Sequence, residues 1–151
     1  MLIEKWEIRN ATEQDVDYFL EAFHQIYNHQ FDRHTFFEIF KKKLKSQSSL
    51  LYVAQNAIGN LIGCIVCEKQ ESLQILKPII QIKEFYISPK YRKFNLAEDM
   101  YSYVENKAIK MGIPKIEVMC NYTATTTQNF YLRRKFVIDR KSYIKQLYTI
   151  H

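Results

Sequence analysis

The sequence has few of the features that mark an extracellular or membrane-spanning protein. It contains three cysteines in 151 residues, too few for the disulfide framework of a small secreted domain. Charged residues interrupt the first apolar positions of the chain, so no secretory signal peptide is expected. No apolar run approaches the roughly 20 residues that a transmembrane helix needs. We therefore expect a cytoplasmic protein that does not associate with membranes.

Motifs for metal and nucleotide chemistry are also scarce. Cys64 and Cys67 form a C-x-x-C motif, but it lies in an expected strand, where residues three apart face opposite sides of the sheet. No second cysteine pair or histidine pair accompanies it, so zinc is not expected and we interpret both thiols as core or half-buried. The sequence also lacks a nucleotide P-loop and a paired-cysteine nucleic-acid module.

The charge balance is positive, with 22 Lys and Arg against 16 Asp and Glu for a net charge of +6. This charge suits a phosphate-bearing ligand, an acidic acceptor or nucleic acid, although a lysine-rich surface is the simpler explanation and the one we favour. The densest basic run, 41–45, lies on an expected helix and forms no longer basic stripe, which disfavours nucleic acid. With 47% hydrophobic residues, the chain is expected to fold as one globular domain over 1–151.

The pattern of apolar residues predicts an alternation of strands and helices. Thr12-Glu13-Gln14-Asp15 resembles a capping box, which marks the start of a helix. Residues Val16 to Tyr27 then repeat apolar side chains with helical spacing. We expect further helices over 34–45, 95–111 and 125–134. Strands are expected over 6–9, 50–54, 61–69, 79–87, 115–120, 136–138 and 142–148. The resulting order is β-α-α-β-β-β-α-β-α-β-β.

The segment Ile80–Gly112 organises the chain. An expected strand ends at Ser88-Pro89, a basic turn follows, and an amphipathic helix begins near Asn95 and stops at Gly112. The first N–H groups of a helix have no partners within the helix and lie at its positive end. A strand that enters a helix through a cationic turn is therefore a candidate anion site.

Residues 89–97 of this segment resemble the coenzyme A loop of the GCN5-related N-acetyltransferases, whose pattern is Arg/Gln-x-x-Gly-x-Gly/Ala. Arg92 and Ala97 fit the pattern, and Asn95 stands where glycine is usual. The order of elements matches the same family over nearly the whole chain. The resemblance implies an α/β (α+β) fold with a mixed, mostly antiparallel central sheet of about seven strands, flanked by four helices.

The resemblance also implies acetyl-CoA as cosubstrate and no metal. Backbone amides of the loop would hold the pyrophosphate, with charge added by two basic side chains. The loop residues are Arg92, Lys93, Phe94, Asn95, Leu96 and Ala97. In the family, a bulge around Tyr86 and Ile87 parts two strands, and a strand N–H there can bind the thioester oxygen. Those two residues are therefore expected to contact the coenzyme.

Two side chains are implied as catalytic. The run 130–136 resembles the family's Phe-Tyr-x-x-x-Gly-Phe, with Lys135 in place of the glycine. Tyr131 would then contact the coenzyme and protonate its leaving thiolate, since a phenol keeps its proton at neutral pH. Glu84 would accept the proton of the acceptor amine, although a sheet glutamate paired with a lysine remains the alternative. The family's first two helices line the acceptor pocket, and His29, His34, Tyr27 and Phe31 lie in that part of the chain, although surface positions also explain the two histidines.

These observations predict an acyl-CoA-dependent N-acyltransferase that moves acetyl to a primary amine by direct attack in a ternary complex. The acceptor would be a small molecule or a peptide, and homodimers are common in the family. One alternative is a non-catalytic acyl-CoA-binding or sensor module, which Asn95 and Lys135 favour. A second is acylation of an RNA-linked amine, which the absence of a clustered basic stripe places last.

Overall fold

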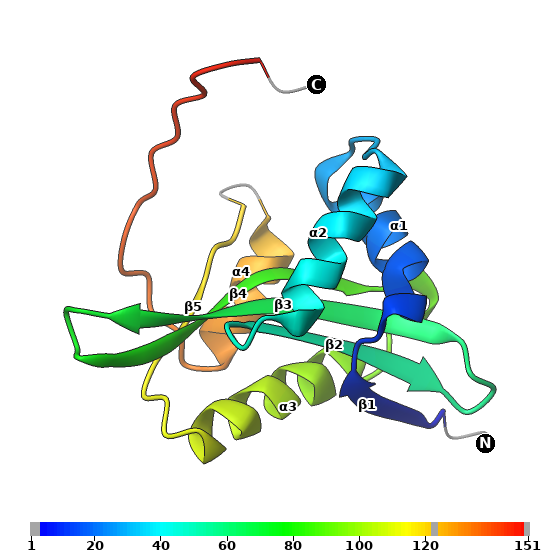
Figure 1. Ribbon diagram of the computed structural model, residues 1–151. Helices are drawn as coiled ribbons and strands as arrows, with labels where there is room; N and C mark the ends of the chain where they lie inside the picture. The colour runs from blue at the N-terminus through cyan, green and yellow to red at the C-terminus, as the bar shows by residue number, and fades with distance from the viewer. Residues whose placement is uncertain (1–3, 122–123, 150–151) are drawn as a thin grey trace. The chain divides into compact units, whose positions relative to one another are not determined.

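The structure is a computed structural model that describes residues 4–121 and 124–149. The chain divides into two compact units, residues 1–119 and 120–151. Within the described residues, the first unit contains a five-stranded sheet and helices α1, α2 and α3, and the second contains helix α4, Thr125–Arg133 (Figure 1).

The sheet has the strand order β1-β2-β3-β4-β5. Its strands are β1 (Trp6–Asn10), β2 (Ser49–Asn56), β3 (Leu61–Ser72), β4 (Lys77–Ile87) and β5 (Ile116–Val118). The first four pair antiparallel, and β5 joins β4 in parallel. The prediction of a mixed, mostly antiparallel sheet is therefore confirmed, but the described residues form five strands and not seven.

The missing strands are the two that were predicted to close the chain as a hairpin. Residues 136–138 and 142–148 belong to no strand or helix. Both segments contain β-branched and aromatic residues, which strands favour, but three residues in the first arm offer few cross-strand pairs. The strand predicted over 115–120 is also shorter, because its pairing with β4 ends at Val118.

The helices agree closely with the periodicity of the sequence. They are α1 (Val16–Tyr27), α2 (Arg33–Lys45) and α3 (Leu96–Lys110), with short 3-10 turns η1 (Glu13–Asp15) and η2 (Pro89–Tyr91). Asp32 caps α2, because its carboxylate accepts the Thr35 N–H at 2.9 Å. Gly112 ends α3 with φ +70°, the left-handed conformation that glycine adopts at little cost.

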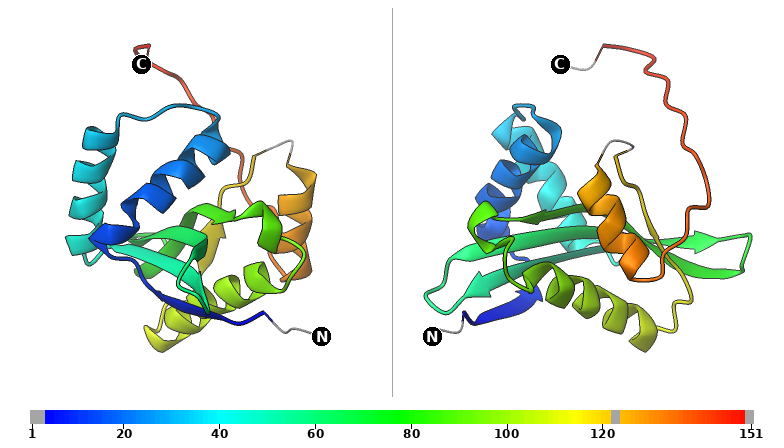
Figure 2. Two further views of the ribbon diagram at one scale, coloured as in Figure 1. Left: turned by 90° about the vertical axis from the view of Figure 1, so that its right-hand side faces the viewer. Right: turned by 180° about the vertical axis from the view of Figure 1, so that it is seen from behind.

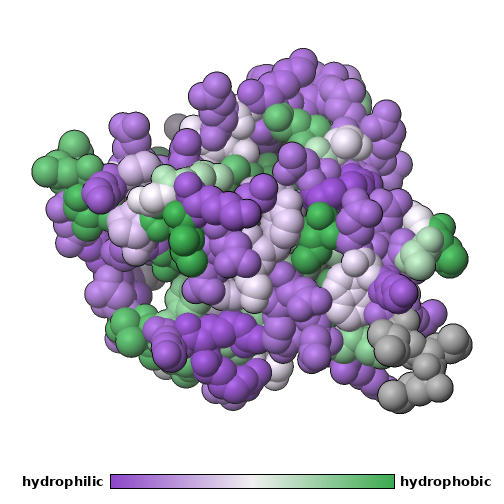
Figure 3. Space-filling view, turned by 90° about the horizontal axis from the view of Figure 1, so that it is seen from below, coloured by the Kyte–Doolittle hydropathy of each residue, from purple (hydrophilic) through white to green (hydrophobic). Residues whose placement is uncertain are grey.

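The helices of the first unit cover both faces of its sheet. Helices α1 and α2 lie over one face and α3 lies over the other (Figures 1 and 2). Seen from below, in Figure 3, the surface is mostly hydrophilic with scattered apolar side chains, as expected where α3 turns its polar side outward. Phe19 and Phe40 lie in the core under α1 and α2, and Leu96 anchors α3 with no exposed surface.

The C-x-x-C cysteines lie inside this sandwich, as predicted. Cys64 belongs to the core cluster under α1 and α2, and Cys67 is fully buried in the same strand. Burial raises the pKa of both thiols well above the ordinary value of a cysteine. Because the thiolate is the reactive form, these cysteines are inert packing residues.

The start of α1 is held by an ion pair in which Asp15 is buried and Arg9 is partly exposed. Both oxygens of Asp15 accept hydrogen bonds from the Arg9 guanidinium, at 2.8 and 3.0 Å, and one also accepts the Thr12 N–H at 2.8 Å. The last contact is the reciprocal bond of the predicted capping box. Burial alone would raise the pKa of Asp15, but the hydrogen bonds from Arg9 and Thr12 outweigh it and lower the pKa.

Replacing Asp15 with asparagine is expected to lower the free energy of unfolding at neutral pH by about 2 kcal/mol, since it leaves the Arg9 charge without its partner. Because the folded-state pKa of Asp15 is lowered, its stabilisation is present above the unfolded-state value near about 4 and is lost as pH falls through the folded-state value. Urea unfolding at pH 7 and in acid measures both effects. Asp17→Asn is the control, because its pair with Arg33 is exposed and worth little. Equal effects of the two variants would contradict the expectation.

Candidate functional site

The candidate site begins where β4 and β5 part. Their parallel pairing runs only from Ile80–Ile116 to Ile82–Val118, whereas β4 continues along β3 to Ile87. The β3 register shifts at the same place, because Val66 pairs with Glu84 while Cys67 pairs with Ile82. Lys83 is therefore the extra residue of a bulge. The bulge expected around Tyr86 and Ile87 lies earlier in the strand, immediately after the last residue that pairs with β5.

The direction of the Ile87 peptide groups follows from the hydrogen bonds of the neighbouring residue. Ser88 N–H donates to the Ile62 carbonyl oxygen at 2.9 Å, next to the Gly63–Ile87 pair. In an antiparallel ladder such a bond flanks a non-hydrogen-bonded pair. The N–H and C=O of Ile87 consequently point away from β3, toward the side from which β5 has departed. The Ile87 N–H is thus directed so that it can donate to a carbonyl oxygen placed in the gap.

The loop after β4 is folded against the strand end. Arg92 Nε donates to the Ile87 carbonyl oxygen at 2.9 Å, and the guanidinium carbon lies 5.4 Å from the centre of the Tyr86 ring. Tyr91 is buried, and its hydroxyl accepts a hydrogen bond from the Asn56 side chain at 3.1 Å. These contacts hold the basic turn next to the first residues of α3, so 92–97 form one continuous turn and helix start.

Asn95 is the cap residue of α3 and has φ −84° and ψ 24°. Because φ is negative, the position does not require the left-handed freedom of glycine. Its carbonyl oxygen accepts the Asp99 N–H at 3.0 Å, the first bond of the helix, and its side chain is exposed. The N–H groups of the first helical turn have no partners within the helix, which makes this loop suitable for an anion.

Glu84 lies on β4 immediately after the bulge and is half-buried. Its Oε2 atom accepts a hydrogen bond from the Tyr27 hydroxyl at 2.5 Å, so its partner is a tyrosine of α1 and not a lysine. Burial raises the pKa of Glu84, and the Tyr27 hydrogen bond and the charges of Lys83 and Lys43 offset only part of that rise. A carboxylate with a raised pKa is a better proton acceptor than an exposed glutamate.

Two tyrosines of α1 contact the end of β4, and no motif in the sequence predicts either contact. Tyr27 bonds Glu84, and the Tyr18 hydroxyl lies 2.6 Å from Ser88 Oγ at the strand end. Tyr18 also meets the Tyr86 ring edge-on, with centroids 6.2 Å apart. Helical periodicity places both tyrosines on α1 but cannot identify partners that are 57 or 70 residues away. Together they tie α1 to the part of β4 that carries the candidate site.

Tyr131 lies in α4, in the second unit. Its carbonyl oxygen accepts the N–H groups of Arg134 and Phe136, and its ring meets the ring of Phe136 at 5.1 Å. Lys135 ends this turn with φ +68°, the conformation in which glycine is favoured, at a cost of about 1 kcal/mol. The local turn is therefore well defined, and the role of Tyr131 at the thioester stays a prediction.

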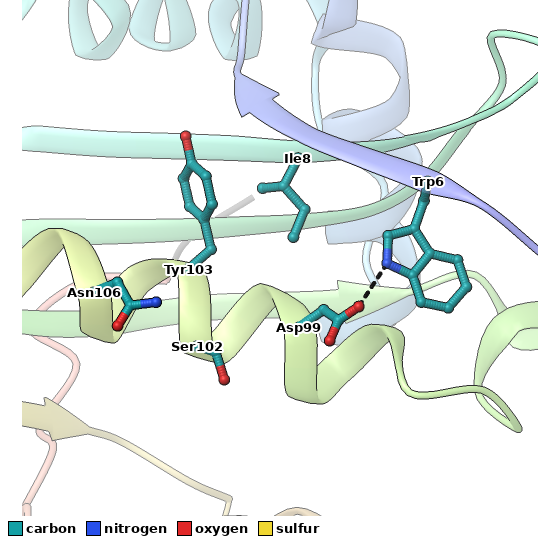
Figure 4. A pocket seen from close by; sticks show the side chains of 6 residues that line it. All are labelled: Trp6, Ile8, Asp99, Ser102, Tyr103 and Asn106. Atoms are coloured by element: carbon teal, nitrogen blue, oxygen red, sulfur yellow. Dashed lines mark hydrogen bonds between the residues drawn. The ribbon is translucent and has the colours of Figure 1, made fainter.

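A cavity of about 340 Å³ lies between β1 and α3 (Figure 4). It is lined by Trp6, Ile8, Asp99, Ser102, Tyr103 and Asn106. The Trp6 indole N–H donates to Asp99 Oδ2 at 2.9 Å across it, a bond drawn in Figure 4. None of the predicted site residues lines this cavity. It lies between the edge strand β1 and α3, apart from the candidate site.

In residues 4–121 and 124–149, no three or more His, Cys, Asp or Glu side chains come together where they could hold a metal ion. No helix within these ranges combines the length and apolar character required to cross a bilayer.

Comparison with known proteins assigns the fold and the family. A model of the acetyltransferase (GNAT) family matches residues 16–136. The chain therefore belongs to the acetyltransferase (GNAT) family, as the loop and the element order had predicted. No curated protein matches the chain significantly.

Solved structures share the fold at low sequence identity. A transcriptional regulator from Bacillus halodurans C-125 superposes with a TM-score of 0.86 at 15% identity, over 95% of this chain and all of the other. The ribosomal-protein-alanine N-acetyltransferase from Brucella melitensis biovar Abortus 2308 has a TM-score of 0.79 at 14% identity, over 94% and 99%. An aminoglycoside N-acetyltransferase in complex with CoA has a TM-score of 0.82 at 12% identity, over 97% of each chain.

Proposed function

We propose that the protein transfers an acetyl group from acetyl-CoA to a primary amine by direct attack in a ternary complex. The observation that carries this proposal is the end of β4. There the Ile87 N–H points into the gap left by β5, the basic loop leads into α3, and Glu84 lies on the same strand. One strand thus presents a candidate oxyanion donor and a candidate base.

The loop 92–97 fits a coenzyme pyrophosphate. The backbone N–H groups at the start of α3 would bind the phosphate oxygens, and Lys93 and Arg92 would add positive charge. The Arg92 side chain is already bonded to Ile87, so it also holds the loop against the strand that would meet the thioester. A related acetyltransferase fold has been solved with CoA, which supports this assignment.

Each bond change has a residue to assist it. The acceptor reaches the site as an ammonium, and Glu84 accepts its proton, directly or through a water, so that the free amine can attack. As the amine nitrogen bonds to the thioester carbon, the Ile87 N–H stabilises the negative charge that develops on oxygen. The carbon–sulfur bond then breaks, and Tyr131 donates its proton to the departing thiolate. The nitrogen loses its second proton to solvent as the amide forms, and solvent returns a proton to the Tyr131 phenolate. The products are an N-acetyl amine and free coenzyme A.

Calorimetric titration with acetyl-CoA tests coenzyme binding. Release of free thiol in the presence of a panel of primary amines tests acetyl transfer. We expect binding at micromolar to millimolar concentrations, the usual range for such substrates, and turnover with at least one amine. No detectable binding at about 1 mM acetyl-CoA would overturn the proposal. Binding without acetylation of any amine would instead identify a non-catalytic acyl-CoA-binding module, and a steep fall of RNA affinity with salt would point to an RNA-linked acceptor.

Replacing Asn95 with glycine is expected to change coenzyme A affinity by less than about threefold. The backbone at this position is already in an ordinary conformation, and a glycine cap costs only a few tenths of a kcal/mol. Calorimetric titration of the variant with coenzyme A measures the change. A tenfold gain in affinity would show that the asparagine side chain crowds the phosphate.

A further inference from the structure

We propose that the acceptor is a primary amine with one positive charge and an aromatic or otherwise apolar body. Its ammonium would bind Glu84, and its body would lie against the aromatic side chains where α1 ends. This inference rests on the proposed function and adds the chemical class of the acceptor.

Three aromatic side chains gather where α1 ends and the segment leading to α2 begins. The ring centroids of Phe23, Tyr27 and Phe31 lie 5.7 to 6.2 Å from one another, and we call these residues the aromatic triad. Tyr27 is half exposed, at 50%, and Phe23 and Phe31 keep part of their surface accessible. His24 stacks on the Phe31 ring, with centroids 5.8 Å apart. The accessible parts of the triad offer an apolar surface, and the ring of Tyr27 offers a face that attracts cations.

The aromatic triad is joined to Glu84 by one hydrogen bond. Tyr27 donates to Oε2 of the carboxylate and so holds it beside the rings, leaving the Oε1 atom for the ammonium of an acceptor. Tyr27 is thus a positioning residue, because it acts through Glu84 and does not need to touch the reacting atoms. An amine bound to Oε1 would extend its carbon chain toward the aromatic triad.

The charges around Glu84 favour a single cation. Glu68, the other carboxylate that acts on Glu84, is already bonded to Lys43 at 2.6 Å. The remaining charges that act on Glu84 are those of Lys83 and Lys43, which are both positive. A half-buried carboxylate can compensate one ammonium, whereas further charges on a polyamine would be desolvated without partners and would meet a protein of net charge +6.

Calorimetry on the protein saturated with coenzyme A tests this inference, because the coenzyme without its acetyl group prevents turnover. The probes are phenethylamine, butylamine and spermidine. We expect phenethylamine to bind at least about tenfold more tightly than spermidine and several-fold more tightly than butylamine, since the ring adds buried apolar area. Tighter binding of spermidine, or equal binding of all three, would overturn the inference without any variant.

A matched pair of variants locates the binding surface. Phe31→Leu is expected to weaken phenethylamine binding about fivefold and to leave butylamine binding within about twofold, because only the former stacks on the ring. Phe37→Leu is the control, since the Phe37 ring is covered by Lys41 and Arg33 and lies outside the aromatic triad. Equal losses in the two variants would contradict the assignment.

Thiol release with acetyl-CoA separates this inference from the proposed function. If phenethylamine binds preferentially but no amine is acetylated, the proposed function fails and the binding preference stands. If spermidine is acetylated with the higher kcat/KM, the acetyltransferase assignment stands and the monoamine preference fails.

Discussion

Replacement of Tyr131 by phenylalanine is expected to lower kcat at least about 100-fold while coenzyme A binds as tightly as before. The expelled thiolate needs a proton, and the substitution removes only the hydroxyl that would donate it. The decrease in kcat should therefore match the usual contribution of a general acid. Because a positioned acid acts in the transition state and not in the ground state, KM should change little. Steady-state kinetics and calorimetric titration with coenzyme A measure the two quantities separately.

Tyr143→Phe is the matched control for this experiment. It removes the same hydroxyl from a side chain that is 90% exposed, and kcat should stay at the wild-type value. A Tyr131→Phe enzyme with wild-type kcat would remove Tyr131 from the mechanism and leave water as the proton donor. A loss of coenzyme affinity in place of kcat would give the residue a binding role.

Replacement of Glu84 by glutamine is expected to lower kcat/KM about 100-fold near neutral pH, because the amide cannot accept the proton of the ammonium. In the wild-type enzyme the pH profile of kcat/KM should fall on the acid side as Glu84 becomes protonated. Since burial raises the pKa of Glu84, this fall should occur at higher pH than for an exposed glutamate. The acid limb should disappear in the variant, and initial rates from pH 5 to 9 would show both effects.

Glu38→Gln is the control for Glu84→Gln, because Glu38 is an exposed residue of α2 paired with Lys41. A shared acid limb in wild type and Glu84→Gln would assign the titration to another group. The kcat/KM of Tyr27→Phe should lie between the values of Glu38→Gln and Glu84→Gln, because this variant keeps the Glu84 carboxylate but removes its hydrogen bond from Tyr27. Loss of the Tyr27 hydrogen bond removes one effect that lowers the pKa of Glu84, so the acid limb should move to still higher pH.

Much of the fold could be predicted because its signals are local. The capping box at Thr12, the helical period through Tyr27 and the stop at Gly112 each depend on residues within a few positions, and all three appear in the structure. The family assignment was accessible for a similar reason, because the coenzyme loop and the order of elements are properties of the linear chain. The match over residues 16–136 confirmed it.

The predictions that failed concern pairing between distant segments. Residues 136–148 contain β-branched and aromatic side chains but form no strand, because such residues favour strands without supplying a hydrogen-bonded partner. The bulge of β4 lies at Lys83 because it is set by the register against β3, which no short motif records. Asn95 stands at the family's glycine position, and only the structure shows that its φ is negative.

By itself the sequence determined the family, the four helices and the candidate loop, since helical period, caps and a contiguous motif are written in neighbouring residues. Only the tertiary structure decided that β5 leaves β4 after Ile82, that the Ile87 N–H faces the gap, and that Tyr27 holds Glu84. These features arise where segments far apart in the chain meet. Their geometry depends on packing and strand register, which local patterns restrict but do not specify.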